Sequence, residues 1–383
     1  MLNSLDIKNY RNLKELKINS LGRVNLITGK NNTGKSALLE AIAIYATKGD
    51  LALIYQLLGE RGENFRRTEE DKNTTESNIR ALSSMFTNRI VRFDNDGAIS
   101  IGSIESTSSR EKKSAKTFVF LRFVKHVDET QKDGQECMIT KRRIALENEI
   151  DKQFEYCKVN IEISVKSDVA TFELNSNPNS PGRYGVMGIE PGLGATQSLQ
   201  FIRTRNIDRE INGKLFDSIT LTEKEAHVID ALKIIEPLTE RIAFVEEAPR
   251  ERTAVIKLSN NPRVLPLQSM GDGINRILTI ILALVNADNG FLLIDEFENG
   301  LHHTVQKQLW NIIFNLAQKL NVQVFVTTHS EDCISGFESV LNSPGNSLDG
   351  KLIRLDNENG TIKQVEFNAH ELKIANNQNI EIR

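Results

Sequence analysis

The beginning of the chain combines two hydrophobic periods. Residues 5–18 alternate apolar and polar positions around a turn at 9–12, which predicts a strand pair. Residues 24–27 are mostly apolar, as in a buried strand, and a helical spacing of apolar residues follows. The pattern therefore predicts a hairpin, a strand, a short loop, and a helix from residue 34 to about residue 45.

Between residue 90 and about residue 207 the hydrophobic period changes to two. Short alternating segments are separated by breaks rich in Asn, Ser and Gly, which is typical of strands joined by turns. The segments that predict strands are 90–93, 99–104, 117–124, 137–140, 159–165 and 170–174. We expect them to form a mostly antiparallel sheet, inserted after the first helix.

The remainder of the chain alternates helices and strands. A capping box at 222–225 opens an apolar pattern at helical spacing that ends at Pro237. Strands are then predicted at 242–246, 253–258, 291–294 and 322–327, and a hairpin at 351–355 and 361–367. A helix separates 291–294 from 322–327, and such a right-handed strand–helix–strand unit brings the two strand ends close together.

These elements predict an α/β fold with an inserted, mostly antiparallel β subdomain. The chain has 383 residues, of which 39% are hydrophobic, so it can bury a substantial core. We expect a single domain over 1–383. Its N-terminal half would span 1–88, the β-rich insert 89–220, and the C-terminal half 221–383.

The loop before the first helix carries the most specific motif. Its sequence at 29–36, Gly-Lys-Asn-Asn-Thr-Gly-Lys-Ser, matches the phosphate-loop pattern and lies between a predicted strand and a predicted helix. Such loops turn backbone N–H groups, and the positive end of the helix, toward phosphate oxygens. Lys35 is predicted to reach the β and γ phosphates of ATP, and the Ser36 hydroxyl to hold Mg²⁺. The other residues predicted to bind the nucleotide are Gly29, Asn31, Asn32, Thr33 and Gly34.

Three polar residues follow the strands at 291–294 and 322–327. Asp295 and Glu296 come directly after the first strand, and His329 comes two residues after the second. Ligands of open α/β sheets bind at the carboxyl ends of strands. We therefore expect Asp295 to support Mg²⁺, Glu296 to accept a proton from the attacking water, and His329 to contact the γ phosphate.

A second loop has the composition of an anion site. The run Ser-Met-Gly-Asp-Gly at 269–273 precedes an apolar helix pattern that starts at residue 274. A Ser- and Gly-rich loop that opens a helix presents N–H groups and the positive helix end to an anion.

Composition and charge limit the possible partners and location of the protein. The net charge is −3 and the pI is about 6.2, so DNA binding would require a local basic patch. Candidate patches are Arg203, Arg205 and Arg209, or Lys112, Lys113 and Lys116. The three cysteines form no C-x-x-C pair, and no apolar run approaches the roughly 20 residues of a membrane span. We expect a cytoplasmic protein with no membrane contact.

In this order, the motifs resemble the ABC-type ATPases, within them the SMC, RecF and OLD branch. The matching segments are 9–12, the phosphate loop, 39–42, the signature loop at 269–273, the Walker B strand at 293–296, the D-loop at 298–302 and the H-loop at 327–330. The runs Glu-Asn-Gly-Leu-His and Thr-Thr-His-Ser are most similar to OLD-type ATPase subunits of bacterial antiphage systems. The resemblance covers residues 1–47 and about 225–335.

The resemblance implies a homodimer, or a higher even oligomer, that closes head to head on ATP. Ser269, Gly271, Asp272 and Gly273 of one chain would then face the nucleotide of the other, and Arg11 would touch the nucleotide of its own chain. Met270 and Asp272 depart from the common Leu-Ser-Gly-Gly-Gln pattern, which implies weaker or slower closure. The glutamine that usually follows the phosphate-loop half in this family is not assigned, since Gln56, Gln197 and Gln200 cannot be aligned with it.

The output of such an ATPase has three interpretations. Too few residues follow His329 for a TOPRIM domain, which needs about a hundred. The first interpretation is therefore control of a separate TOPRIM-type nuclease or toxin in antiphage defence. A RecF-like repair ATPase that binds DNA directly is the second, and an ATP-gated scaffold that traps an effector with little hydrolysis is the third.

Overall fold

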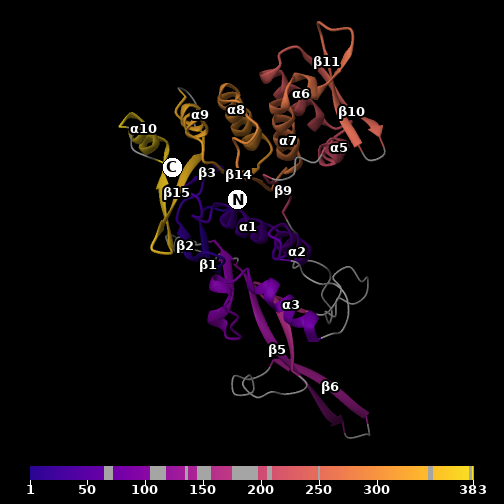
Figure 1. The fold of residues 1–383 in the computed structure, drawn as a ribbon, viewed down its shortest axis with the longest axis vertical. Helices are drawn as coiled ribbons and strands as arrows, with labels where there is room; N and C mark the ends of the chain where they lie inside the picture. The colour runs from indigo at the N-terminus through magenta and orange to yellow at the C-terminus, as the bar shows by residue number, and fades with distance from the viewer. Residues whose placement is uncertain are drawn as a thin grey trace, which may run out of the picture.

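The computed structural model describes most of the chain. The described residues are 1–63, 72–103, 118–133, 137–144, 157–174, 197–204, 209–248, 251–343, 348–378 and 382. They form two large sheets with helices between and around them, and a smaller lobe to one side (Figure 1). No helix in these ranges is long and apolar enough to cross a bilayer.

A six-stranded sheet forms the centre of the molecule. Its order is β16 (Thr361–Phe367), β15 (Gly350–Glu358), β3 (Val24–Thr28), β14 (Gln323–Thr327), β13 (Phe291–Ile294) and β9 (Leu199–Ile202). The strands from β15 to β9 are parallel, whereas β16 pairs antiparallel with β15. The carboxyl ends of β3, β14 and β13 therefore lie at one edge, where the phosphate loop and Asp295 begin.

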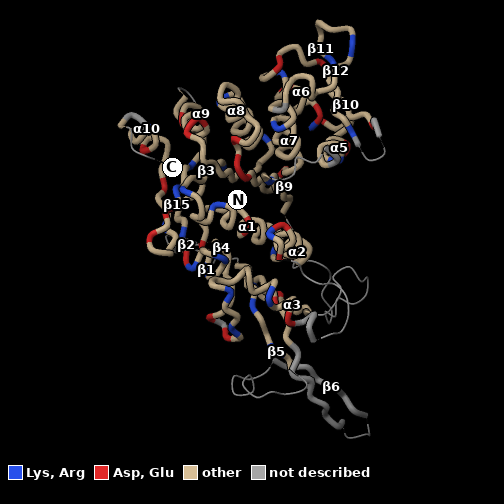
Figure 2. The backbone as a smooth tube through the Cα atoms, in the orientation of Figure 1, with Lys and Arg blue, Asp and Glu red and all other residues tan. Residues whose placement is uncertain are grey.

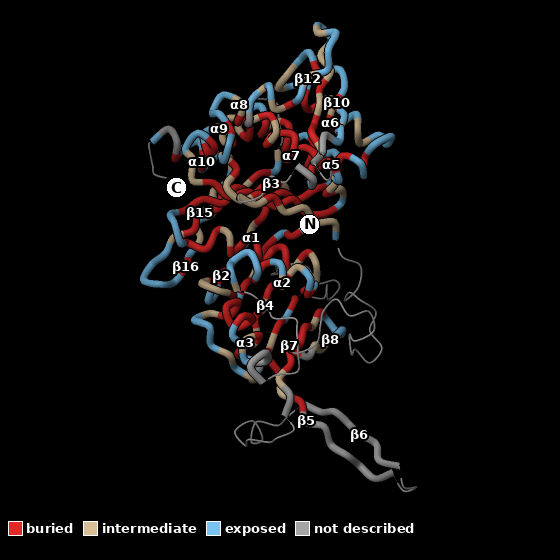
Figure 3. Tube along the Cα trace, turned by 45° about the vertical axis from the view of Figure 1, so that its right-hand side comes forward, coloured by how far each residue is buried: buried red, intermediate tan, exposed pale blue. Residues whose placement is uncertain are grey.

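The two faces of this sheet are buried in two separate cores. Val24, Leu292 and Val324 pack with α7 (Asp272–Asn286), α8 (His303–Lys319) and α9 (Glu331–Leu341). Alternate residues such as Leu293 and Phe325 point to the opposite face, toward α1 (Lys35–Ala46). Both faces of the strands are thus buried (Figure 3), which explains why they read as nearly continuous apolar runs.

A second, antiparallel sheet lies on the far side of α1. Its order is β2 (Leu13–Ile18), β1 (Leu5–Tyr10), β4 (Ile99–Gly102), β5 (Phe118–Asp133), β7 (Cys157–Val165) and β8 (Asp168–Glu173), and β6 (Cys137–Ile144) pairs with β5. The N-terminal hairpin and the strands of the predicted insert therefore belong to one continuous sheet. The helices α2 (Leu51–Glu60) and α3 (Lys72–Ser83) flank it (Figure 1).

The remaining elements complete the lobes. The side lobe contains α5 (Arg209–Asp217), α6 (Glu223–Ile235), β10 (Thr239–Ala248), β11 (Glu251–Leu258) and β12 (Val264–Pro266), and α10 (Ala369–Asn377) follows the last hairpin. Short 3₁₀ turns cover Thr87–Arg89, Asn95–Gly97 and Leu267–Met270. Basic and acidic residues are interspersed along the helices and the longer strands of the side lobe (Figure 2).

The predicted α/β fold with an antiparallel subdomain is confirmed, and one predicted strand is wrong. Residues 90–93 form no strand: Asn88 and Arg89 both have positive φ, and the Asn9 amide donates to the Gly97 carbonyl, so the chain turns here. No strand was predicted at 199–202, within the expected antiparallel insert, yet these residues form β9 of the parallel sheet. Three of the four residues of this edge strand are half-buried, so the segment shows no clear alternation.

Candidate nucleotide site

At two positions of the phosphate loop, the backbone adopts a conformation that only glycine accommodates. Gly29 and Gly34 have φ of 138° and 90°. A Cβ at Gly29 would lie 2.3 Å from the Leu355 carbonyl oxygen, and one at Gly34 would lie 2.8 Å from Leu13 Cδ2. These glycines let the chain leave β3, turn back beside β15 and enter α1 at Lys35 with its free N–H groups facing the loop.

Lys35 is held against this loop. Its Nζ donates to the carbonyl oxygens of Gly29 and Lys30, at 2.7 and 2.8 Å. Burial lowers the pKa of Lys35 to about 8, although the carboxylates of Asp295, Glu298 and Glu296 oppose this shift. The amine is therefore protonated at neutral pH but lies close to its titration range.

We expect the affinity for ATP to fall as pH rises above about 8. Only the charged amine pairs with phosphate, so ATP binding should draw a proton onto Lys35 in this range, and affinity should fall by up to about tenfold per pH unit. Calorimetry in buffers of different ionisation enthalpy measures this proton uptake. Lys35→Arg keeps its charge above pH 8, and the same slope in that variant would contradict the assignment to Lys35.

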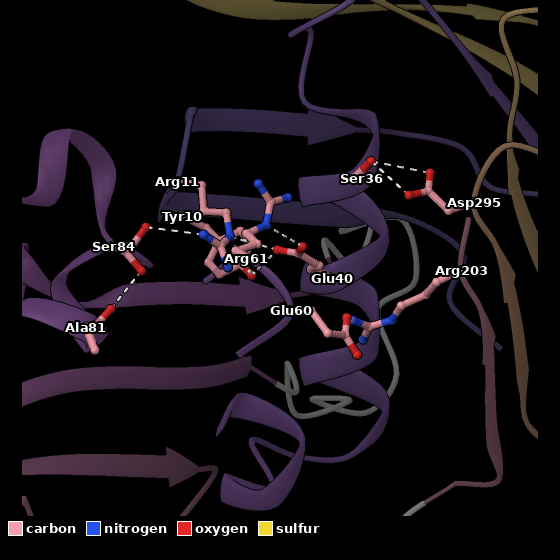
Figure 4. Close-up of polar contacts among 10 residues, drawn as sticks. All are labelled: Tyr10, Arg11, Ser36, Glu40, Glu60, Arg61, Ala81, Ser84, Arg203 and Asp295. Carbon is pink, nitrogen blue, oxygen red and sulfur yellow. Dashed lines mark hydrogen bonds and ion pairs between the residues drawn. The ribbon is translucent and has the colours of Figure 1, made fainter. Parts of the chain in front are cut away.

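Ser36 and Asp295 meet at the carboxyl edge of the parallel sheet. The Ser36 hydroxyl lies 3.0 and 3.3 Å from the two carboxylate oxygens of Asp295 (Figure 4). Thr327, at the end of β14, donates its hydroxyl to Asp295 Oδ1 at 2.6 Å. A hydroxyl and a carboxylate fit Mg²⁺, which prefers a few hard oxygen ligands and keeps several waters. These two residues would hold the ion, which supplies positive charge against the phosphates.

The backbone of Glu296 is fixed in a rare conformation. Its φ is 52°, and its N–H donates to Thr327 Oγ1 at 2.9 Å. From α7, Arg276 donates Nη2 to the carbonyl oxygens of Asp295 and Glu296, both at 3.3 Å. Positive φ is costly for a non-glycine residue, so the surrounding hydrogen bonds must stabilise this backbone conformation. The backbone conformation in turn sets the direction of the Glu296 side chain.

Arg276 and Glu298 support the site and were not identified from the sequence. Arg276 is almost wholly buried, and its Nε has no hydrogen-bond partner among the described residues. Glu298 accepts from the Thr328 hydroxyl at 2.8 Å and from the His329 N–H at 2.7 Å, which fixes the start of the His329 loop. The available signal for Arg276 was one charge within the apolar helix pattern at 274–285.

A carboxylate on α1 organises the other side of the pocket. Glu40 accepts from Arg11 Nε at 2.7 Å, from Arg61 Nε at 2.8 Å and from the Tyr10 hydroxyl at 2.9 Å (Figure 4). Burial raises the pKa of Tyr10, so its hydroxyl remains a donor. Arg11 also donates to the Ser84 carbonyl, while its Nη2 is buried without a hydrogen-bond partner in the described ranges.

The phosphate loop and several of the polar residues around it line a cavity of about 740 Å³. Its lining includes Arg11, Asn31 to Ser36, Arg61, Arg89, Asp295, Glu296 and His329, so the structure brings most of the expected residues together. Gly29 lies beneath it and bonds Lys35. The size is that of a ligand pocket, and the lining is rich in groups that bind phosphate.

The signature loop lies apart from this cavity. Ser269 is exposed and donates its hydroxyl to the Pro266 carbonyl, and Gly271 is exposed with φ of 101° just before α7. Asp272 and Gly273 form the first residues of that helix, and the Asp272 side chain is outside the described part. Among the described residues, the cavity lining contains none of 269–273.

The comparisons with known proteins show the family of this chain. Residues 24–332 match a protein family described as "AAA domain, putative AbiEii toxin, Type IV TA system". The chain belongs to this family. The prediction of an ATPase is thereby confirmed, and this AAA ATPase is also 26% identical, over 368 residues, to an "ATP/GTP phosphatase" of Helicobacter pylori. That alignment covers 89% of this chain and 88% of the relative.

Solved structures of SMC heads are also similar to this AAA ATPase. One is an SMC head bound to the C-terminal winged-helix domain of ScpA, with 12% identity, a TM-score of 0.48, and coverage of 96% of this chain and 98% of that one. Another is the SMC head domain of Thermotoga maritima, with 11% identity, a TM-score of 0.42 and the same coverage. The membership of the OLD-type antiphage branch stays a prediction.

The basic clusters considered for DNA are only partly described. Lys112, Lys113, Lys116 and Arg205 lie outside the described residues, as does the side chain of Arg209. Arg203 is paired with Glu60. DNA binding therefore stays a prediction.

Proposed function

We propose that two copies of this ATPase close head to head on ATP, each completing the other's site. The observation that carries this proposal is the separation of the signature loop from the cavity of its own chain. Ser269 and Gly271 are exposed before a helix of 15 residues, whose positive end attracts an anion. A second copy can present this surface to the γ phosphate, and the two-fold arrangement makes both sites equivalent.

Within each closed site the residues divide the hydrolysis of ATP among them. A water attacks the γ phosphorus, the bond to the β–γ bridging oxygen breaks, and ADP and phosphate leave. Glu296 accepts the proton of the attacking water, while Lys35 and His329 donate to γ-phosphate oxygens. Ser36 and Asp295 hold the Mg²⁺, and Arg11 and Arg61 lie on the other side of the pocket toward the rest of the nucleotide.

We expect Glu296→Gln to form a dimer with Mg²⁺ and ATP that the wild-type chain forms only while ATP persists. Without hydrolysis the two nucleotides stay in place and hold the copies together. Light scattering after size-exclusion chromatography, with ATP, with ADP and without nucleotide, measures the mass.

A second substitution tests whether the signature loop acts on the nucleotide of the other copy. In the Glu296→Gln chain, Ser269→Arg places a bulky side chain in the proposed contact and should abolish the dimer while ATP still binds. Ser167→Arg, at an exposed turn between β7 and β8, is the matched control and should dimerise normally. A mass that is the same in every condition would refute an ATP-driven closure and favour a nucleotide-gated scaffold.

We propose that this switch acts on a separate effector, a TOPRIM-type nuclease or a toxin in antiphage defence. The family description, with its words "putative AbiEii toxin, Type IV TA system", supports a toxin–antitoxin setting for this ATPase. The similarity of the Glu-Asn-Gly-Leu-His and Thr-Thr-His-Ser runs to OLD-type subunits supports the antiphage setting. In this reading the closed dimer is the form that the effector recognises.

A further inference from the structure

Strand β9 places the backbone of Arg203 beside Asp295, just outside the residues that line the cavity. Ile202 is paired with Ile294 in the parallel register, and the Asp295 N–H donates to the Ile202 carbonyl at 2.9 Å. Since neighbouring parallel strands end at the same edge of a sheet, the residue after Ile202 starts beside Asp295. Residue 203 therefore begins next to the carboxylate that meets Ser36.

The Arg203 side chain extends from the end of β9 toward Glu60, away from Ser36 and Asp295 (Figure 4). It is 19% exposed, lies over the Phe201 ring at 4.3 Å from the centroid, and pairs with Glu60 at the end of α2. Its Nη2 is buried and has no hydrogen-bond partner among the described residues. Burial lowers the pKa of Arg203, opposed by Glu40, Asp295 and Tyr10, yet arginine remains charged at any working pH.

The chemistry of the guanidinium favours binding of a phosphate over binding of a metal ion. A guanidinium has five N–H donors and no acceptor, so it cannot serve as a metal ligand as a glutamine oxygen can. Its fork matches the oxygens of a phosphate, and a buried donor without a partner is costly until an acceptor arrives. A nucleotide bound at Lys35 and Ser36 would bring such an acceptor to the same edge of the sheet, where Asp295 and residue 203 begin.

We propose that Arg203 exchanges its ion pair with Glu60 for the γ phosphate when ATP binds. Glu60 is then a competitor that holds the arginine back in the nucleotide-free chain. The inference rests on the proposed ATP site and adds to it a phosphate ligand from the strand next to Asp295. It also makes the site distinguish ATP from ADP, because only ATP carries the group that Arg203 would bind.

The test compares the affinities for Mg·ATP and Mg·ADP in the full chain carrying Glu296→Gln, which keeps ATP intact. Arg203→Gln should weaken ATP binding about tenfold or more and leave ADP binding unchanged. Glu60→Gln should instead strengthen ATP binding, and it should have no effect once Arg203 is already Gln. Arg122→Gln, which breaks the Arg122–Glu162 pair in the antiparallel sheet, is the matched control and should change neither affinity.

A purely structural role for the pair predicts a different pattern. If Arg203 only ties β9 to α2, both substitutions should lower the melting temperature and leave the ratio of ATP to ADP affinity unchanged, which would overturn the inference. Should Arg203→Gln fail to fold, Glu60→Gln decides alone, since an unchanged or weaker preference for ATP contradicts the proposal. The proposal of an ATP-driven dimer is tested separately by the molecular mass in solution. The dimer proposal and the Arg203 proposal can therefore fail independently.

Discussion

Glu296→Gln is expected to lower the rate of ATP hydrolysis by about 100-fold or more, because the amide cannot accept a proton from the attacking water. The substitution keeps the shape and length of the side chain. The hydrogen bonds that fix its direction join the backbone N–H and carbonyl of residue 296 to Thr327 Oγ1 and Arg276 Nη2, so they remain. A residue with φ of 52° accommodates Gln no worse than Glu. The expected defect is therefore chemical, with ATP affinity retained within about threefold.

Single-turnover hydrolysis with enzyme in excess over ATP measures this effect without product release. Asp332→Asn is the control, since Asp332 is an exposed carboxylate in the first turn of α9, close in sequence to His329 but outside the cavity lining. It should hydrolyse ATP at the wild-type rate. If Glu296→Gln hydrolyses as fast as this control, another group accepts the proton and the assignment of the base is wrong.

The parts of the site predicted from sequence are those encoded in contiguous residues. The phosphate loop could be recognised because two glycines, a lysine and a serine stand at fixed spacing between a strand and a helix. Asp295 and Glu296 could be placed because a buried parallel strand has a continuous apolar pattern and a defined end. Both groups directly follow a strand that the local pattern identifies, and the end of that strand determines their position in the fold.

The residues that were missed depend on contacts between distant segments. Glu40 pairs with Arg61 across 21 positions, and Arg276 reaches the Glu296 carbonyl across 20. No spacing rule connects such positions, since the connection is made by the packing of α1 on α2 and of α7 on β13. A buried charge within an apolar pattern signals a partner but does not name it.

Strand β9 shows the same limit for the fold. A segment of three half-buried residues and one buried residue at the edge of a sheet lacks both the continuous apolar run and a clear alternation. No strand was therefore predicted here, the segment was left within the β-rich insert, and Arg203 was considered only as part of a basic patch. The parallel register with β13, which only the fold provides, gives this arginine its place beside Asp295.

Lys35→Ala is expected to weaken ATP binding by about 100-fold and to abolish hydrolysis at micromolar ATP, because it removes the cation that pairs with the β and γ phosphates. The chain should nevertheless remain folded. Burial lowers the pKa of Lys35 to about 8, so keeping the amine charged at neutral pH costs folding free energy. Removing the amine relieves this cost, which offsets the loss of its bonds to the Gly29 and Lys30 carbonyls.

Titration with a fluorescent ATP analogue and a thermal melt of the same samples separate the two effects. Lys30→Ala is the matched control, since Lys30 lies in the same loop but is exposed, and it should bind ATP within about threefold of the wild type. A melting temperature of Lys35→Ala near that of the wild type, with ATP binding lost, assigns the lysine to the ligand. Retained ATP binding would contradict the placement of the phosphates at this loop, because the variant lacks the cation that is proposed to pair with them.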